Sequence, residues 1–158
     1  MYKLVKKIRT TFLVYLTHGL ALPMLKRFRK PEIFPYTESQ LSQFYEGSLG
    51  KDLYLFLQKR NLPLLPYYAR HDIKHIILGY DTTEEGEVCL QCFMLGNGHL
   101  SFPVSATFLY GLLTMPEHWT LFRKAFKRGR KCDSIQGWPW FEILSIPTMQ
   151  LRSHIPTE

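Results

Sequence analysis

The sequence has few cysteines, no acidic residue in its first 30 positions and only a short apolar stretch near its N-terminus. Three cysteines in 158 residues, Cys89, Cys92 and Cys132, are too few and too unevenly spaced for a disulfide framework, which suits a reducing compartment. Cys89 and Cys92 form a Cys-x-x-Cys pair without a second pair. We therefore interpret them as core residues rather than as a zinc or redox site.

Because residues 1–30 contain no Asp or Glu, the net positive charge of the chain is concentrated there. The formal net charge is +7, and eight of the 20 Lys and Arg residues lie in residues 1–30. The rest of the chain has 12 basic and 13 acidic residues, so the basic surplus belongs to one segment. A nucleic-acid-binding domain would carry that surplus across its folded body, so we expect no nucleic-acid partner.

Residues 3–28 have the apolar spacing of a helix, with a kink at Pro23. Their apolar centre, Phe12 to Leu22, is about half of the ~20 residues that a membrane-spanning helix needs, and no signal-peptidase site follows it. A core helix with solvated ends is one reading. The other is an interfacial helix, which predicts that residues 1–30 bind an anionic membrane surface, with the protein cytoplasmic and peripheral on the inner face of the membrane.

The chain also lacks strand-like alternation, repeats and low-complexity tracts. Its content of 46% hydrophobic and 15% aromatic residues excludes a disordered chain. We predict an all-α, single-domain bundle of about six to seven helices, with residues 31–158 as the helical domain.

Helix signals divide this domain. Two capping boxes, Thr37-x-x-Gln40 and Thr82-x-x-Glu85, and an N-cap at Ser48 predict three helix starts. A further helix is expected from about Leu65 to Leu78, with Pro66 in its first turn and Gly79 after its end. Breaks at Gly96–Gly98 and near Thr114–Glu117 separate an apolar run, Leu100 to Leu113, from a helix ending near Gly129, and a short helix closes the chain at about residues 147–153.

A cluster of metal-ligand residue types lies in the sequence HDIKHIILGYDTTEEGE, residues 71–87. His71 and His75 are four apart, so on a helix they share one face, and Asp72 borders that face. Glu87 follows the Gly79-to-Gly86 break and can return from the next helix. Two imidazoles and two carboxylates placed this way predict a divalent-metal site on a helix hairpin.

The same residues allow a plainer reading, because an Asp beside a His near a helix start is often a capping or surface pair. The second basic cluster of the sequence also allows two interpretations. It is either a solvated helix face or a surface that meets phosphate or anionic lipid. Its members are Arg123, Lys124, Lys127, Arg128, Arg130 and Lys131.

With these residues in place, the chain resembles the coenzyme Q (ubiquinone) biosynthesis protein 4 family over roughly residues 34–155. The signature of that family is HDxxH, eleven residues and then Glu, which His71, Asp72, His75 and Glu87 match at every position. The stretch Glu46 to Gly50, reading EGSLG, resembles the family's helix start. The region of Gly129 and Arg130 and the tail from Trp140 to Ile155 resemble its C-terminal part.

The resemblance implies a helical protein that sits on a membrane and binds an isoprenoid or prenylated aromatic lipid. It implies a part in ubiquinone biosynthesis, with oxidative removal of the ring carboxylate as the reaction and His71, Asp72, His75 and Glu87 as the metal-binding and catalytic residues. We expect other quinone-biosynthesis enzymes as partners. A homodimer is also compatible with the sequence. For the metal, mixed histidine and carboxylate ligands favour zinc, followed by iron, manganese or magnesium.

Two alternatives remain from other classes of protein. In the first, the chain is a non-catalytic lipid-binding scaffold: Leu100 to Leu113 hold a prenyl chain and the metal is structural. In the second, it is an HD-type phosphohydrolase, which needs a further His and Asp on other helices. His18 and Asp133 are the residues available for that role, and their sequence contexts do not support it.

Overall fold

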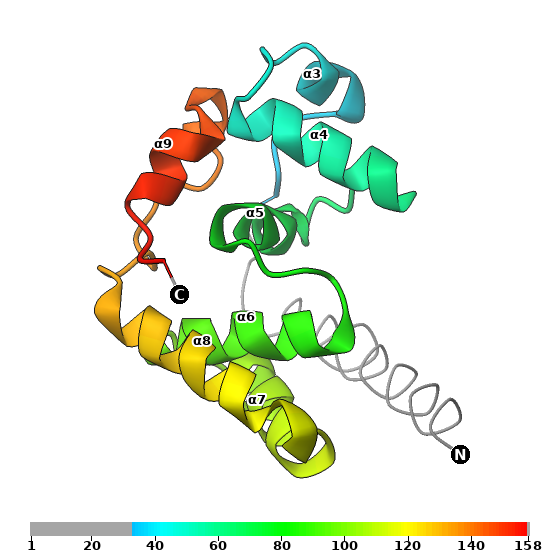
Figure 1. Cartoon of the computed structure of the whole chain (residues 1–158). Coiled ribbons are helices and arrows are strands. Elements are labelled where there is room, and N and C mark those ends of the chain that lie inside the picture. The colour runs from blue at the N-terminus through cyan, green and yellow to red at the C-terminus, as the bar shows by residue number, and fades with distance from the viewer. Residues whose placement is uncertain (1–32, 158) are drawn as a thin grey trace. The chain divides into compact units, whose positions relative to one another are not determined.

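A computed structural model describes residues 33–157, and the predicted helix of residues 1–30 lies outside this range. Within the range, every regular element is a helix, apart from one isolated bridge between Ser48 and Pro147 (Figure 1). The α-helices are α3 (Glu38–Ser42), α4 (Leu49–Arg60), α5 (Ala69–Leu78), α6 (Glu84–Gly96), α7 (Phe102–Thr114), α8 (Trp119–Lys131) and α9 (Thr148–Ser153), and the 3-10 turns are η2 (Pro116–His118) and η3 (Ile143–Ser145).

The described residues belong to two compact units, which we treat separately. The first contains residues 33–80 and 137–156, with α3, α4, α5, η3 and α9. In the second, residues 81–136 form α6, α7, η2 and α8. The prediction of an all-α chain with about seven helices is confirmed for the described residues. The predicted boundary at residue 30 stays a prediction.

In the first unit, α4 packs against α3, α5 and η3. Leu49, Leu53 and Leu57 of α4 stand four residues apart and are buried on one face. The predicted N-cap is confirmed, because the Ser48 hydroxyl accepts a hydrogen bond from the backbone N–H of Lys51. The rigid packing of α4 on α5 gives α5, which carries the histidines, a fixed support.

The C-terminal segment completes this unit. The guanidinium of Arg152 in α9 donates two hydrogen bonds to the carbonyl of Ile76 in α5, from Nε at 3.1 Å and from Nη2 at 2.6 Å. The backbone N–H groups of Leu49 and Thr148 bond to the carbonyls of Ile146 and Gly47, respectively. All of these bonds join residues more than 70 positions apart in the sequence, and the two from Arg152 hold the C-terminal half of α5 in place.

The second unit is built around the close crossing of α6 and α8, which lie side by side in Figure 1. A Cβ atom on Gly96 would lie 2.2 Å from the carbonyl oxygen of Phe126, and one on Gly129 would lie 2.1 Å from that of Phe93. Only glycine permits two backbones to approach this closely. The other side of α6 packs on α7, where Gly111 faces Val88.

Two predicted features of the helices are confirmed. The capping box of Thr37 and Gln40 is present at the start of α3, and Gly79 ends α5 with a φ of 76°. Cys89 and Cys92 are buried in α6, as expected of core residues, and desolvation raises the pKa of the Cys92 thiol to about 12. Among residues 33–157, none of the helices has the length and hydropathy that a membrane crossing requires.

Two predicted helix starts were wrong. α5 begins at Ala69, so Pro66 precedes the helix, and its carbonyl accepts a hydrogen bond from the N–H of Phe34. The cap of α6 is Thr83 instead of Thr82, and its hydroxyl accepts the N–H of Gly86. A Cβ atom on Gly86 would lie 2.1 Å from the carbonyl oxygen of Asp81. This tight turn places Gly86 three residues into the helix, which makes Thr83 the cap.

Candidate metal centre

His71 and His75 lie one turn apart on α5 and face each other. Their Nε2 atoms are 3.1 Å apart, and their ring centroids are 4.7 Å apart with an interplanar angle of 82°. His75 is 2% exposed, whereas His71 is partly exposed. The four-residue spacing therefore places the two Nε2 atoms next to each other, and the ring of His71 is partly accessible to solvent.

The ring of His75 is held by residues outside the motif. Its Nδ1 lies 3.0 Å from the carbonyl oxygen of Tyr80. Because a carbonyl only accepts, Nδ1 carries the proton and Nε2 keeps its lone pair for a ligand. Phe56 of α4 stacks on the same ring, with centroids 6.3 Å apart and planes 24° apart. Together these contacts fix both the tautomer and the direction of Nε2.

The distance between the two Nε2 atoms fits a shared metal ion. Two histidine nitrogens bound at about 2.0–2.1 Å to neighbouring positions of one octahedral or tetrahedral metal lie about 2.8–3.4 Å apart. The observed 3.1 Å falls in that range. The other arrangement that a separation this short permits is a hydrogen bond from the Nε2–H of His71 to the Nε2 of His75.

Glu87, in the first turn of α6, completes a group of three candidate metal ligands. One carboxylate oxygen of Glu87 and one nitrogen each of His71 and His75 all lie within 4.8 Å of one another. This set of two imidazoles and a carboxylate is typical of sites for divalent transition metals. The predicted convergence of the two histidines and Glu87 is confirmed.

Asp72, the fourth predicted ligand, is not one of the residues in this group. It is partly exposed in the first turn of α5, where a carboxylate interacts favourably with the helix dipole. Its role as a ligand stays a prediction. The sequence analysis missed Phe56 and the carbonyl of Tyr80. The sequence signal for Tyr80 was its position directly after Gly79, where the chain leaves the helix and its carbonyl can turn back.

The helix of the histidines also carries two cations one turn apart, Arg70 and Lys74. Burial, followed by the neighbouring Arg70 charge, lowers the pKa of Lys74 to about 8. The ammonium of Lys74 lies over the ring of Trp140 at 5.6 Å from its centroid, and the guanidinium of Arg70 lies over Phe141 at 5.5 Å. These cation–π contacts therefore stabilise the two charges and offset part of the free energy that their burial costs.

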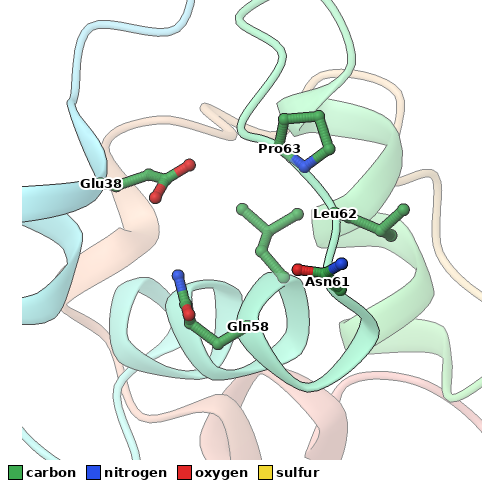
Figure 2. A pocket seen from close by; sticks show the side chains of 6 residues that line it. Glu38, Gln58, Asn61, Leu62 and Pro63 are labelled. Atoms are coloured by element: carbon green, nitrogen blue, oxygen red, sulfur yellow. The ribbon is translucent and has the colours of Figure 1, made fainter.

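A shallow pocket in the first unit is separate from this group. It is lined by Glu38, Leu57, Gln58, Asn61, Leu62 and Pro63 (Figure 2). The carboxylate of Glu38 already accepts a hydrogen bond from the N–H of Leu64 at 3.1 Å. None of the three grouped ligand residues lines this pocket, so we assign it no part in the metal centre.

Comparison with known structures identifies a protein that shares this fold. No protein-family model matches the chain, and no curated protein matches it. The chain is similar to the crystal structure of a protein from Nostoc punctiforme PCC 73102 described as a putative ubiquinone biosynthesis protein. The TM-score is 0.59 at 18% sequence identity, over 96% of this chain and 80% of that one. The likeness shows that the two chains share a fold, and in this chain that fold carries a His-His-Glu group able to hold a metal ion.

Proposed function

We propose that His71, His75 and Glu87 bind one divalent metal ion, with Asp72 as a fourth ligand or a neighbouring base. The observation that carries the proposal is the convergence of two Nε2 atoms to 3.1 Å with a carboxylate oxygen in the same group. Zinc suits these ligands best, and iron, manganese and magnesium are the alternatives. At such a site the metal would act as a Lewis acid toward an oxygen of the substrate.

The substrate we propose is a polyprenylated aromatic acid of ubiquinone biosynthesis, and the reaction is oxidative removal of the ring carboxylate. The carboxylate leaves as carbon dioxide, a hydroxyl group from water takes its place on the ring carbon, and dioxygen accepts the two electrons and becomes hydrogen peroxide. The resemblance in sequence and the likeness in fold support this choice. The partly exposed edge of His71 would face the head group, while the buried ring of His75 keeps its orientation through Tyr80. The prenyl tail would lie on apolar side chains of Leu100 to Leu113.

Charge on α5 favours an acidic head group. Arg70 and Lys74 put two positive charges on the helix that carries the histidines. Asp72 on the same helix offsets one of them, so a carboxylate or phenolate that approaches α5 gains Coulomb energy from the remaining positive charge. The carboxylate oxygens of Glu87 or Asp72 could take up the proton of a ring hydroxyl, which is the work of a general base.

The first test measures metal content. Purified protein should contain close to one equivalent of metal, and His71→Ala and His75→Ala should lose most of it. His154, an exposed residue at the end of α9, provides the matched control His154→Ala, which should keep its metal. Metal retained by His75→Ala at the wild-type level would refute the site.

The second test measures the reaction. Protein, metal and dioxygen are incubated with a prenylated 3,4-dihydroxybenzoate, and loss of the carboxyl group is followed by mass spectrometry. We expect turnover by the wild type and none by the double variant His71→Ala, His75→Ala. If both proteins give the same low turnover while both retain prenyl lipid on purification, the chain is a lipid-binding scaffold and the decarboxylase proposal is wrong.

A further inference from the structure

The helix α7 is apolar on two sides, and only one of them is covered by the second unit. It contains no acidic or basic residue over its length, Phe102–Thr114. Val104, Thr107, Tyr110 and Gly111 are buried, and α7 packs on α6. The solvent-facing side of a surface helix normally carries charged and polar residues, whereas α7 has no charged residue there, and Ser105 and Thr114 are its partly exposed polar residues.

The outer face of α7 is formed by large side chains that remain in contact with solvent. Phe102 is 55% exposed, Leu109 52% and Leu113 78%, and their spacing of seven and then four residues places them on one side of the helix. Leu112 adjoins them at 38% exposed, and Leu100 precedes the helix at 74% exposed. Several large apolar side chains exposed on one side of a helix mark a candidate interaction site.

Trp119 connects this face to the next helix. Its indole Nε1–H donates to the carbonyl of Leu112 at 2.9 Å, while the side chain is 50% exposed. The ring therefore lies against the C-terminal end of α7, with its polar atom satisfied and its apolar edge in solvent. Tryptophan is enriched at the interface between membrane and water for this combination of properties.

The helix α8 continues from Trp119 with positive charge only. Phe122, Ala125 and Gly129 are its buried positions, and Arg123, Lys124, Lys127, Arg130 and Lys131 are exposed on the opposite side. Arg123 is one turn beyond Trp119 and Arg130 three turns beyond it, on the same stripe of the helix. Glu117 is the one acidic residue in the sequence between His99 and Cys132.

We propose that the outer face of α7, Trp119 and the basic side of α8 together dock on an anionic lipid bilayer. We call these residues the α7–α8 surface. Apolar side chains enter the acyl boundary, the indole lies at head-group level, and the Lys and Arg side chains contact lipid phosphates. This inference goes beyond the proposed metal chemistry and does not depend on it. The exposed leucines proposed above to hold the prenyl tail are part of the α7–α8 surface, so the tail and the bilayer would share this apolar face. It adds a second membrane-binding element to the one predicted for residues 1–30.

Charge decides between a bilayer and a second copy of the chain. In a two-fold dimer through this surface, the same patch of both copies would be buried, which would bring the positive charges of both α8 helices into one interface. Like charges brought together in this way oppose association. An anionic bilayer instead pairs the apolar face with acyl chains and the cations with phosphates, so it satisfies both parts of the surface.

Vesicle binding by the full chain tests the proposal. Leu112→Glu, Leu113→Glu should reduce partitioning into anionic vesicles by about tenfold or more, since it removes two apolar contacts and adds two charges of the wrong sign. The matched control changes two exposed apolar residues of the other unit, Leu55→Glu and Met149→Glu. All of these proteins keep residues 1–30, so any binding through that segment is common to them. Equal vesicle binding by the two double variants would overturn the proposal.

The contribution of charge has its own variant. Lys124→Glu, Lys127→Glu should weaken binding to anionic vesicles by at least about fivefold per residue and leave binding to zwitterionic vesicles nearly unchanged. Lys59→Glu, at an exposed position of α4, is the control and should behave as the wild type. If the lysine variants bind anionic vesicles as the control does, the basic side of α8 does not face lipid.

A third measurement locates the surface and identifies a competing occupant. The chain has three tryptophans, and quenching by brominated acyl chains should be lost in Trp119→Phe and retained in Trp138→Phe. Light scattering without lipid should give the same mass for the wild type and for Leu112→Glu, Leu113→Glu. A wild-type dimer that this double variant converts to a monomer would show that the face is a subunit contact, and the lipid proposal would fall.

Discussion

Gly129 of α8 lies against the carbonyl oxygen of Phe93 in α6, so closely that an added Cβ atom would stand 2.1 Å from that oxygen. The neighbouring atom belongs to a helix backbone, which cannot move aside as the end of a flexible side chain can. Gly129→Ala should therefore force α6 and α8 apart and lower the free energy of unfolding by roughly 2–4 kcal/mol. Urea denaturation measures the change.

Gly137→Ala is the control for this prediction. No atom lies within 4 Å of a Cβ atom built on Gly137, and its backbone is not in the left-handed region. The substitution should leave the free energy of unfolding unchanged or raise it slightly, because alanine restricts the unfolded chain. Equal destabilisation by the two substitutions would mean that the close crossing of α6 and α8 does not control stability.

Asn97 supplies a second test of the same unit. Its buried side-chain amide donates to the carbonyls of Gly129, Cys132 and Asp133, and its Oδ1 accepts the N–H of Ile135 at 3.0 Å. Asn97→Leu would remove all four hydrogen bonds in the core of this unit, at a cost of roughly 2–4 kcal/mol in the free energy of unfolding. Asn97→Asp keeps the acceptor but loses the donors, so it should also destabilise. Thermal unfolding of both variants checks this, and wild-type stability of either would contradict it.

Local sequence signals predicted much of the fold because the interactions behind them are local. The capping box at Thr37, the N-cap at Ser48 and the left-handed Gly79 each involve residues within four positions of one another. The helical spacing of His71 and His75 is equally local. These features needed no knowledge of how the helices pack.

The errors arose where two adjacent residues could both serve as a cap, or where a contact distant in the sequence decided the outcome. Thr82 and Thr83 are both possible caps, and the close approach of the Asp81 carbonyl to Gly86 selects Thr83. Pro66 was placed in a helix, but its carbonyl bonds to Phe34, 32 positions earlier. The stacking of Phe56 on His75 and the bond from Arg152 to Ile76 depend in the same way on packing. No pattern within a short window contains the information on these three long-range contacts.

Lys74 predicts an unusual dependence of stability on pH. Burial and Arg70 lower its pKa from the usual 10.5 to about 8 in the folded protein. Between these two values the unfolded chain binds more protons than the folded protein does, so the free energy of unfolding should rise with pH across that window. Below about pH 8, both states hold the proton and the penalty for burying the charge is constant.

Lys74→Met removes that penalty and should raise the free energy of unfolding at pH 7 by roughly 1–2 kcal/mol, less whatever the contact with Trp140 contributes. The rise in stability toward about pH 10 should also flatten in this variant. Urea denaturation in the presence of a chelator separates this effect from metal binding. Lys59→Met, at an exposed position, is the control and should keep the wild-type profile. A profile that stays steep in Lys74→Met would assign the pH dependence to another group.

The last prediction separates the ligand role of Glu87 from the general effect of its charge. Glu84, Glu85 and Glu87 all lie in the first turn of α6. A carboxylate there stabilises the helix by about 0.3–1 kcal/mol through its interaction with the helix dipole. Of these three, only Glu87 is grouped with His71 and His75. Glu87→Gln and Glu85→Gln should therefore cost similar stability in metal-free protein, since each removes one charge from the same helix start. Only Glu87→Gln should weaken metal binding, by about tenfold or more if a carboxylate oxygen is a direct ligand. Competition with a chromophoric chelator measures both affinities. If Glu85→Gln weakens binding as much as Glu87→Gln does, the carboxylate acts on the metal through its charge alone, and the histidines bind it without Glu87.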